Sequence, residues 1–267
     1  MNTEDSSKYD KLETYSTAQL LEGINELDSH VSQAVKQAIP QIEALCDRIL
    51  EKMSLGGRIF YCGSGTSGRL GIVDASECPP TYGVAQGLVI GIIAGGDKAI
   101  RQAIENAEDD TQACIAQLQA HNIGPHDVLI GISASGRTPY VLGGMQACNA
   151  LGITTACIVC NGNSAIAQAA QFPIEIMTGP EFVRGSTRMK AGTGTKLVLN
   201  MITTTVFIKR GHVQGNKMVD MQLKNDKLVD RAQRMVMNEL NVSLKTAKDL
   251  LAKNKSVREA IKAFQNS

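Results

Sequence analysis

The sequence predicts an α/β fold: a three-layer α-β-α sandwich built on a five-stranded parallel sheet. The chain has 267 residues, 43% of them hydrophobic and 20% charged, which is enough for a large globular core. Helical patterns separate most of the predicted strands, an alternation typical of parallel sheets. The strands themselves are predicted from five short apolar runs rich in β-branched residues, at 58–62, 88–94, 127–133, 154–160 and 172–177.

Helices are predicted before and between these strands. Across residues 31–53, apolar residues recur at spacings of three and four, which predicts an amphipathic helical region that Pro40 must kink or divide. A Gly-Gly pair at 56–57 is expected to end this region. Two further helical patterns, at 98–120 and 139–151, supply crossovers that we expect to be right-handed.

A long apolar helix is predicted after the last strand, over residues 190–209. It carries apolar side chains on most of its faces, so we expect burial at the domain centre or against a second subunit. Because one sheet has limited surface to cover such a helix, a homodimer is predicted. Short, moderately basic helices follow, and Ser256 with Glu259 forms a capping-box signature that opens the last one. The predicted units are a first domain with an N-terminal helical arm at 1–224 and a small helical subdomain at 225–267.

Charge and composition exclude several classes of partner. Lysine plus arginine (27) nearly balance aspartate plus glutamate (26), so the net charge of +1 gives no reason to expect a nucleic acid or a membrane surface. No apolar run reaches the roughly 20 residues of a membrane-spanning helix, and the polar, acidic start does not resemble a cleavable signal peptide. We therefore expect a cytoplasmic protein without nucleic-acid or membrane partners.

The cysteines and histidines do not predict a metal site. Seven cysteines, an odd number in apolar surroundings, indicate buried thiols in a reducing compartment rather than a disulfide framework. Cys157 and Cys160 form a CxxC pair, but their spacing within a strand directs the two side chains to opposite faces. The four histidines share no ligand-like spacing with one another or with the cysteines.

The first motif with chemical content follows the first predicted strand. Residues 63–69, GSGTSGR, place small and hydroxyl-bearing residues where the strand ends and a helix begins, a turn that exposes backbone N–H groups to an anion. The three glycines also match the dinucleotide-binding fingerprint, so a dehydrogenase is a competing interpretation. That fingerprint expects an acidic residue about 20 positions further on, and residues 83–92 contain none.

A second strand end repeats this chemistry. The strand at 127–133 runs into SASGRT at 133–138, again hydroxyls and a glycine before a helix. Hydroxyls and N–H groups from two neighbouring strand ends can surround one phosphate, whereas a pyrophosphate needs a single glycine-lined crossing. Each motif alone also fits a tight turn with a capped helix. Together the two motifs favour a phosphate site.

These residues resemble a known family. The SASGRT turn and the paired hydroxyl-rich strand ends resemble the sugar isomerase (SIS) fold, in which such loops bind phosphosugars. The run GSGTSGRLGIVDASECPPTYG at 63–83 resembles more specifically the N-acetylmuramic acid 6-phosphate etherases. The resemblance continues along the chain, including IAGG at 93–96, AED at 107–109, GPE at 179–181 and GSTRMKAGT at 185–193.

The resemblance implies an activity and two catalytic carboxyl groups. Such an enzyme removes D-lactate from C3 of N-acetylmuramic acid 6-phosphate and leaves N-acetylglucosamine 6-phosphate, by elimination and water addition, without metal or organic cofactor. By resemblance, Glu77 is the acid for the lactate oxygen and Glu108 is the base at C2. Glu77 has separate support, because it is expected to end a helix running from Ser67 to just before Pro79-Pro80, where the helix dipole favours a protonated carboxyl. From the residues alone, an acidic cap of the next helix is the more common meaning of the acidic cluster around Glu108, and only the resemblance favours Glu108 as the base.

Three loops are predicted to hold the substrate. The candidate phosphate-binding residues are Ser64, Gly65, Thr66, Ser67, Ser133, Ser135, Gly136, Arg137 and Thr138. The candidates for binding the sugar or the lactyl carboxylate are Glu181, Ser186, Arg188 and Lys190. A cation would suit that carboxylate, although the same residues fit a charged loop ahead of a helix.

Two further functions are compatible with this fold. One is a regulator that senses a phosphosugar without converting it, similar to the glucokinase regulatory protein. That protein carries two SIS domains in a longer chain, whereas this sequence predicts one such domain and contains both glutamates. The other is an aldose–ketose isomerase, which would differ in its product.

Overall fold

The computed structural model describes residues 2–223, 226–254 and 256–266. The chain divides into two compact units, one formed by Met1–Ala75 and Val89–Thr203 and the other by Ser76–Leu88 and Thr204–Ser267. The predicted domain boundary, between residues 224 and 225, lies outside the described residues. Within the described ranges, no helix is both long and apolar enough to cross a bilayer.

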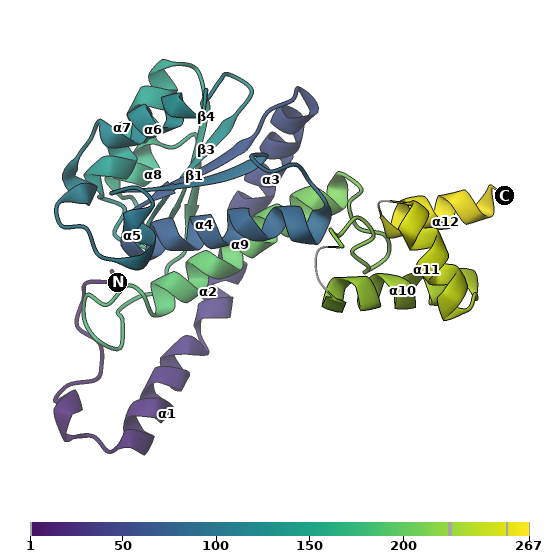
Figure 1. The fold of residues 1–267 in the computed structure, drawn as a ribbon. Helices are drawn as coiled ribbons and strands as arrows, with labels where there is room; N and C mark the ends of the chain where they lie inside the picture. Colours follow the sequence, from purple (N-terminus) through teal and green to yellow (C-terminus); the bar gives the residue numbers. More distant parts are fainter. Residues whose placement is uncertain (1, 224–225, 255, 267) are drawn as a thin grey trace. The chain divides into compact units, whose positions relative to one another are not determined.

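The first unit contains the predicted five-stranded parallel sheet (Figure 1). Each strand begins and ends within two residues of its predicted limits, because the β-branched runs are buried from both sides of the sheet. The strand order is β2-β1-β3-β4-β5, and every neighbouring pair is parallel. The strands are β1 (Ile59–Gly63), β2 (Val89–Ile93), β3 (Val128–Ser133), β4 (Thr154–Val159) and β5 (Phe172–Glu175).

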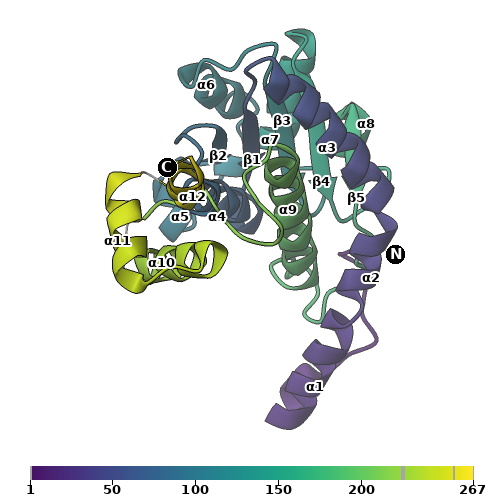
Figure 2. The same cartoon turned by 90° about the vertical axis from the view of Figure 1, so that its right-hand side faces the viewer.

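Helices on both faces of the sheet complete the predicted three layers (Figures 1 and 2). On one face, Phe60 and Leu129 join a core shared with α6 and α7. On the other face, α4 approaches the sheet at Gly71, where an added Cβ would lie 2.8 Å from Tyr61 Cβ. The first face is covered by α6 (Ala113–Ala120), α7 (Pro139–Ala150) and α8 (Ala165–Ala169), and the second by α3 (Ile39–Ser54), α4 (Gly65–Tyr82) and α9 (Lys190–Lys209).

The N-terminal helical region divides at the predicted place. A 3-10 helix, η1 (Leu12–Thr14), and α1 (Thr17–Asp28) precede α2 (Val31–Gln37). The next helix, α3, begins two residues after α2 ends, with Pro40 in its first turn. Proline is tolerated there because the first N–H groups of a helix have no partner within it.

The predicted single helix over 98–120 is wrong. The structure has three short elements instead: α5 (Lys98–Arg101), the 3-10 helix η2 (Ala107–Asp109) and α6. Asn106 adopts a left-handed conformation with φ 59°, which no continuous right-handed helix can include. Asp110 Oδ1 then accepts hydrogen bonds from the N–H groups of Gln112 (2.8 Å) and Ala113 (3.0 Å), which starts a new helix.

The predicted limits of α4 are also wrong, because this helix begins at Gly65 and continues through Pro79 and Pro80 to Tyr82. The Tyr82 ring packs against Phe207, with 4.8 Å between ring centroids, and this packing stabilises the last turn despite the missing proline donors. The helix ends at Gly83, whose φ of 67° and hydrogen bond to the Pro79 carbonyl form a common helix termination. Glu77 therefore lies five residues before the end of the helix, which is more than one turn. The effect of the dipole is confined to the last turn, so the argument from the helix end does not apply to Glu77.

The long helix α9 forms as predicted. Its part in the first unit buries Ala191, Val198, Leu199 and Ile202 and exposes Lys196, Asn200 and Met201. One face of α9 is thus covered within the chain itself, which corresponds to the first of the two expected kinds of burial, whereas Met201 remains exposed on another face.

The second unit is helical after the end of α9. Its small core gathers Met221, Ala232, Val236, Ala247 and Ala260 from the connecting segment and the three helices. Ser256 Oγ accepts a hydrogen bond from the Glu259 N–H at 3.2 Å, which is one half of the predicted capping box. The helices are α10 (Asp226–Leu240), α11 (Leu244–Lys253) and α12 (Val257–Gln265).

The seven cysteines are free and buried, as predicted. Burial raises the pKa of Cys46 to about 11 and that of Cys157 to about 12. These thiols are therefore poor nucleophiles at neutral pH.

Candidate active site

A cavity of about 340 Å³ lies at the carboxyl ends of β1 and β3. These two strands are neighbours, but the chain leaves β1 toward β2 on one side of the sheet and returns to β3 on the other. Such a reversal of strand order opens a crevice between the two following loops, and this crevice is the usual ligand site in open α/β sheets. The topology thus accounts for the position of the cavity.

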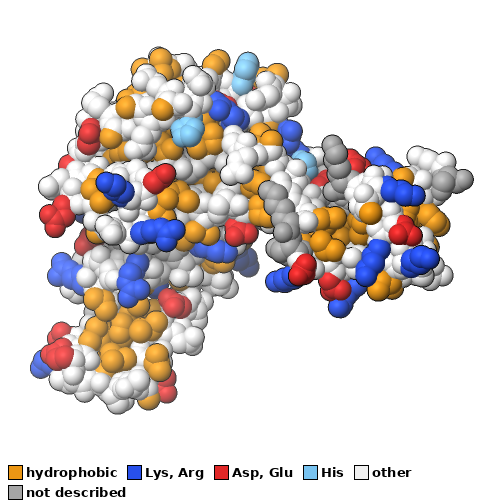
Figure 3. Space-filling model, viewed as in Figure 1, with side chains coloured by type: hydrophobic (Ala, Val, Ile, Leu, Met, Phe, Trp, Pro, Cys, Tyr) orange, Lys and Arg blue, Asp and Glu red, His pale blue; other side chains and the backbone are white. Residues whose placement is uncertain are grey.

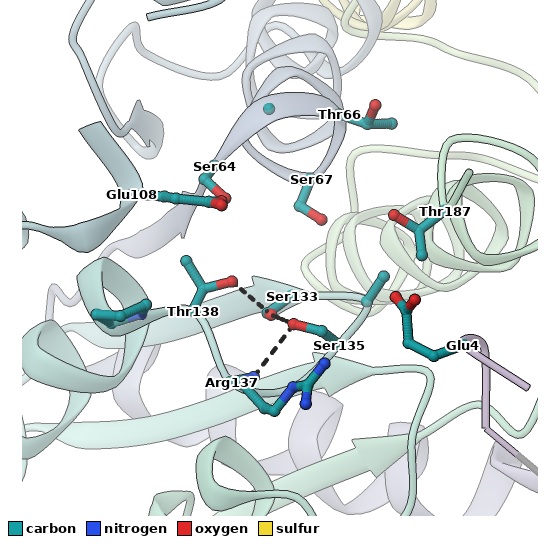
Figure 4. Close-up of a pocket in the computed structure, with 13 residues that line it drawn as sticks. Glu4, Ser64, Thr66, Ser67, Glu108, Ser133, Ser135, Arg137, Thr138 and Thr187 are labelled. Carbon is teal, nitrogen blue, oxygen red and sulfur yellow. Dashed lines mark hydrogen bonds between the residues drawn. The ribbon is translucent and has the colours of Figure 1, made fainter. Parts of the chain in front are cut away.

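Both hydroxyl-rich motifs contribute to the wall of this pocket (Figure 4). The structure brings together eight of the predicted phosphate-binding residues and the predicted base, Glu108. The lining residues are Glu4, Ser64, Gly65, Thr66, Ser67, Glu108, Ser133, Ala134, Ser135, Arg137, Thr138, Pro139 and Thr187.

The loop after β1 presents the start of α4 to the pocket. Gly65 has a φ of 50°, and α4 begins at this residue. The first N–H groups of a helix have no partner within the helix, so they are available to an anion here together with the hydroxyls of Thr66 and Ser67. The packing is tight behind the loop, because an added Cβ at Gly68 would lie 2.5 Å from Ile93 Cγ1.

The loop after β3 is organised by its own hydroxyl groups. Ser133 Oγ lies 2.8 Å from Thr138 Oγ1 and 3.3 Å from Ser135 Oγ, and it accepts a hydrogen bond from the Gly136 N–H. Ser135 Oγ in turn accepts one from the Arg137 N–H at 3.3 Å. Figure 4 shows this chain of contacts along one side of the pocket. The loop therefore holds several hydroxyls in place before any ligand binds.

Glu108 lies on the wall opposite this loop. Its Oε2 accepts a hydrogen bond from Ser64 Oγ at 2.7 Å, and its side chain borders both the main pocket and an adjoining cavity of about 240 Å³. Asp110, not Glu108, accepts hydrogen bonds from the N–H groups of Gln112 and Ala113 at the start of the next helix. The carboxylate at the pocket and the carboxylate at the helix start are thus different residues of the acidic cluster, and the role of Glu108 as the base remains a prediction.

Five predicted binding residues do not line the pocket. Two of them, Glu181 and Lys190, are buried. The Glu181 carboxylate accepts hydrogen bonds from the N–H groups of Lys190 and Ala191, both at 2.9 Å. Lys190 Nζ donates a hydrogen bond to the Thr178 carbonyl at 2.7 Å. Burial raises the pKa of Glu181 and lowers that of Lys190. These contacts hold the start of α9 against the preceding loop. The other residues outside the lining are Gly136, Ser186 and Arg188.

Glu77 belongs to a different part of the molecule from Glu108. It is an exposed residue of α4 within Ser76–Leu88, a segment of the second unit, whereas the pocket belongs to the first. Its role as the acid remains a prediction from the resemblance.

Four lining residues were not among the predicted site residues. Ala134 belongs to the predicted loop after β3 and Pro139 directly follows that loop, whereas the other two come from other parts of the chain. Glu4 reaches the pocket from the N-terminal segment, and Thr187 reaches it from the loop before α9. Thr187 lies inside the GSTRMKAGT run, which was a usable signal. The polar residues around Glu4 carried no periodicity or strand end that would place them at the sheet.

Known structures share the fold at low sequence identity. A protein of Escherichia coli CFT073 aligns with a TM-score of 0.54 and 16% identity, over 76% of this chain and 97% of that one. A phosphoheptose isomerase from Francisella tularensis aligns with a TM-score of 0.54 and 17% identity, over 73% of this chain and the whole of that one. Residues 100–205 match the SIS domain family, and residues 41–149 match the family described as glucokinase regulatory protein N-terminal SIS domain.

Curated relatives are far more similar and cover almost all of the chain. A protein of Christiangramia forsetii named N-acetylmuramic acid 6-phosphate etherase is 57% identical over 99% of this chain and 97% of its own length. Proteins of the same name from Bacteroides fragilis and Porphyromonas gingivalis are 54% and 49% identical over 98% of this chain, and 94% and 96% of their own lengths. The predicted family is thereby confirmed: this chain belongs to the N-acetylmuramic acid 6-phosphate etherases, which are built on the SIS fold.

Proposed function

We propose that this enzyme cleaves the D-lactyl ether of N-acetylmuramic acid 6-phosphate to give N-acetylglucosamine 6-phosphate and D-lactate, a step in the recycling of cell-wall amino sugars. The observation that carries the proposal is the pairing of a pocket lined by hydroxyl groups with a carboxylate, Glu108, on its wall. The relatives named N-acetylmuramic acid 6-phosphate etherase, which are 49–57% identical to this chain, support the proposal.

The two loops would anchor the phosphate of the substrate. Ser67 and Thr66 stand at the start of α4, and Ser135 and Thr138 stand across the pocket in the loop after β3 (Figure 4). Hydroxyls and helix N–H groups donating from several directions suit the three terminal oxygens of a phosphate ester. The anchor would fix the sugar relative to Glu108.

Glu108 is proposed as the base that removes the C2 proton. The open-chain sugar carries an aldehyde at C1, which makes that proton acidic. The electrons of the C2–H bond form the C2–C3 double bond while the C3–O bond breaks. The Ser64 hydroxyl, 2.7 Å from Glu108 Oε2, orients the carboxylate so that its other oxygen is available to the substrate.

Glu77 is proposed as the acid that gives a proton to the departing lactate oxygen. Water then adds its oxygen to C3 and a proton to C2, so the net reaction consumes one water molecule. The two carboxyls therefore act on different bonds and need different protonation states. This difference provides a test of their roles.

Deuterium exchange separates the two roles. Substrate is incubated with each variant in deuterium oxide, and proton NMR scores the C2 signal and free lactate independently. Glu108→Gln should abolish both exchange at C2 and lactate release, whereas Glu77→Gln should stop lactate release and leave some exchange. Asp109→Asn is the matched control, because this exposed neighbour of Glu108 lines neither cavity; it should keep the wild-type activity.

The same measurement decides between the competing functions. Exchange lost in Glu77→Gln and retained in Glu108→Gln would reverse the two roles. Binding of the phosphosugar by the wild-type protein without lactate release would favour the regulator instead. A ketose product would indicate an isomerase.

The functional form is proposed to be a cytoplasmic homodimer. The seven free cysteines support a reducing compartment. Figure 3 shows hydrophobic side chains gathered over α1, where Leu21 is 63% exposed, and such a surface is typical of a subunit contact. Sedimentation at micromolar concentration should give a dimer, and a monomer there would contradict this assignment.

A further inference from the structure

The N-terminal segment is fixed beside the pocket by specific contacts. Thr3 is fully buried, its N–H donates to Asn161 Oδ1 at 2.8 Å, and its hydroxyl accepts from Asn161 Nδ2 at 3.0 Å. The next residue is held from another direction, because Arg184 Nε donates to the Glu4 carbonyl at 2.8 Å. Asn161 follows β4 and Arg184 precedes α9, so the segment is attached at two separate places. The backbone of Glu4 is therefore positioned by the fold.

The side chain of Glu4 projects into the pocket. Figure 4 shows its carboxylate beside Thr187, on the far side of the pocket from Glu108 in that view. In the part of the chain that the structure describes, this carboxylate accepts no hydrogen bond and forms no ion pair. A carboxylate fixed at a pocket wall without a protein partner is available to a ligand.

The chemistry of the remaining wall restricts what that ligand group can be. Hydroxyls, helix N–H groups and Arg137 make the pocket suitable for an anion. The charge of Glu4 opposes a bound phosphate, so Glu4 cannot contribute to the phosphate anchor. A carboxylate accepts hydrogen bonds only, and the groups of a phosphosugar that donate them are the sugar hydroxyls and the amide N–H.

We propose that Glu4 is a specificity-determining residue that accepts a hydrogen bond from a neutral donor on the sugar and disfavours ligands that offer phosphate alone. This inference rests on the proposed function, since it requires a phosphosugar in this pocket. It assigns to one side chain two effects of opposite sign: the charge weakens binding of bare phosphate and strengthens binding of the sugar attached to it.

Glu4→Gln tests both effects with three ligands measured by calorimetry: inorganic phosphate, glucose 6-phosphate and N-acetylglucosamine 6-phosphate. Removing the charge should tighten the binding of inorganic phosphate by roughly threefold to tenfold. Replacing a charge-assisted hydrogen bond by a neutral one should lower the preference for N-acetylglucosamine 6-phosphate over phosphate by about tenfold or more. If glucose 6-phosphate loses the same preference, the donor is a hydroxyl; if it does not, the donor is the amide.

Asp5→Asn is the matched control. It removes the same charge from the adjacent residue, which is exposed and does not line the pocket, so the preference for sugar over phosphate should stay within twofold of the wild type. Equal weakening of all three ligands by Glu4→Gln, or an unchanged preference, would overturn the proposal. Since none of these measurements requires turnover, failure of the wild-type protein to release lactate would count against the proposed function alone.

Discussion

Gly136 tests whether the loop after β3 depends on a backbone conformation that only glycine adopts easily. Its φ of 68° lies in the left-handed region. An added Cβ would collide with Oγ and Cβ of Ser164, the N-cap of α8. The Gly136 N–H donates to Ser133 Oγ at 3.1 Å, so displacement of this backbone also disturbs the hydroxyls that face the pocket. Gly136→Ala should therefore affect both stability and phosphate binding.

The expected magnitude has two parts. Left-handed backbone costs an alanine about 1–2 kcal/mol, and forcing a methyl group into packed surroundings costs about 1–3 kcal/mol. The free energy of unfolding should thus fall by about 2–5 kcal/mol in Gly136→Ala. Ser164→Gly, which removes the colliding atoms, should by itself cost only a few tenths of a kcal/mol because glycine is tolerated at an N-cap. The double variant should recover the second part and retain the first.

Urea-induced unfolding of the wild type, both single variants and the double variant gives the four free energies. Calorimetric titration of the same four proteins with inorganic phosphate gives the phosphate affinity, which shows whether the loop after β3 still holds its hydroxyl groups in place. Phosphate affinity should drop at least about tenfold in Gly136→Ala and recover in part in the double variant. A stability of Gly136→Ala within about 0.5 kcal/mol of the wild type, or no rescue by Ser164→Gly, would show that this account of the loop is mistaken.

Two further predictions concern the pocket and the core. Ser135→Ala should weaken substrate binding by roughly 1.5–3 kcal/mol, or about tenfold to 150-fold in the dissociation constant, because one hydroxyl of a shared phosphate anchor is lost; an unchanged constant in calorimetry would remove Ser135 from the anchor. Burial raises the pKa of Asp74 from 3.8 to about 6, although it accepts hydrogen bonds from Tyr61 and Thr203. Below pH ~3 both states hold the proton. As the pH rises from there toward 6, the unfolded chain releases its proton first, so ionisation should cost the folded state about 3 kcal/mol at pH 7. Asp74→Asn should thus gain stability relative to the wild type between pH 4 and 7 in urea unfolding, and a difference that does not change with pH would contradict the argument.

Much of the sheet was predictable because its signal is local. Runs such as that at 127–133 are apolar on both faces, and only strands buried within a layered fold require this pattern. The pocket loops were predictable for the same reason, since each motif directly follows a strand. Because β1 and β3 are parallel neighbours, the loops that follow them lie side by side at the same edge of the sheet.

The errors arose where tertiary contacts override local preference. Pro79 and Pro80 normally end a helix, but packing of Tyr82 against Phe207 supports one more turn. The helix predicted over 98–120 is interrupted at Asn106, which has a left-handed backbone conformation. Asparagine adopts this conformation more often than most other residue types but only in a minority of cases, so the residue type alone does not reveal the break. Glu4 could not be recognised because its position depends on a contact between residues 158 positions apart, which no periodicity reveals.

That same contact has a consequence for how the protein is made. The N-terminal residues emerge first during synthesis, yet Thr3 cannot find its partner until the chain has grown past β4. Contacts of such long separation form late, after local elements have assembled. One wall of the pocket is therefore completed near the end of folding, and in pulse-labelled hydrogen exchange the Thr3 amide should gain protection after the amides of β3 and β4. Earlier protection would mean that the segment docks on a sheet that is not yet complete.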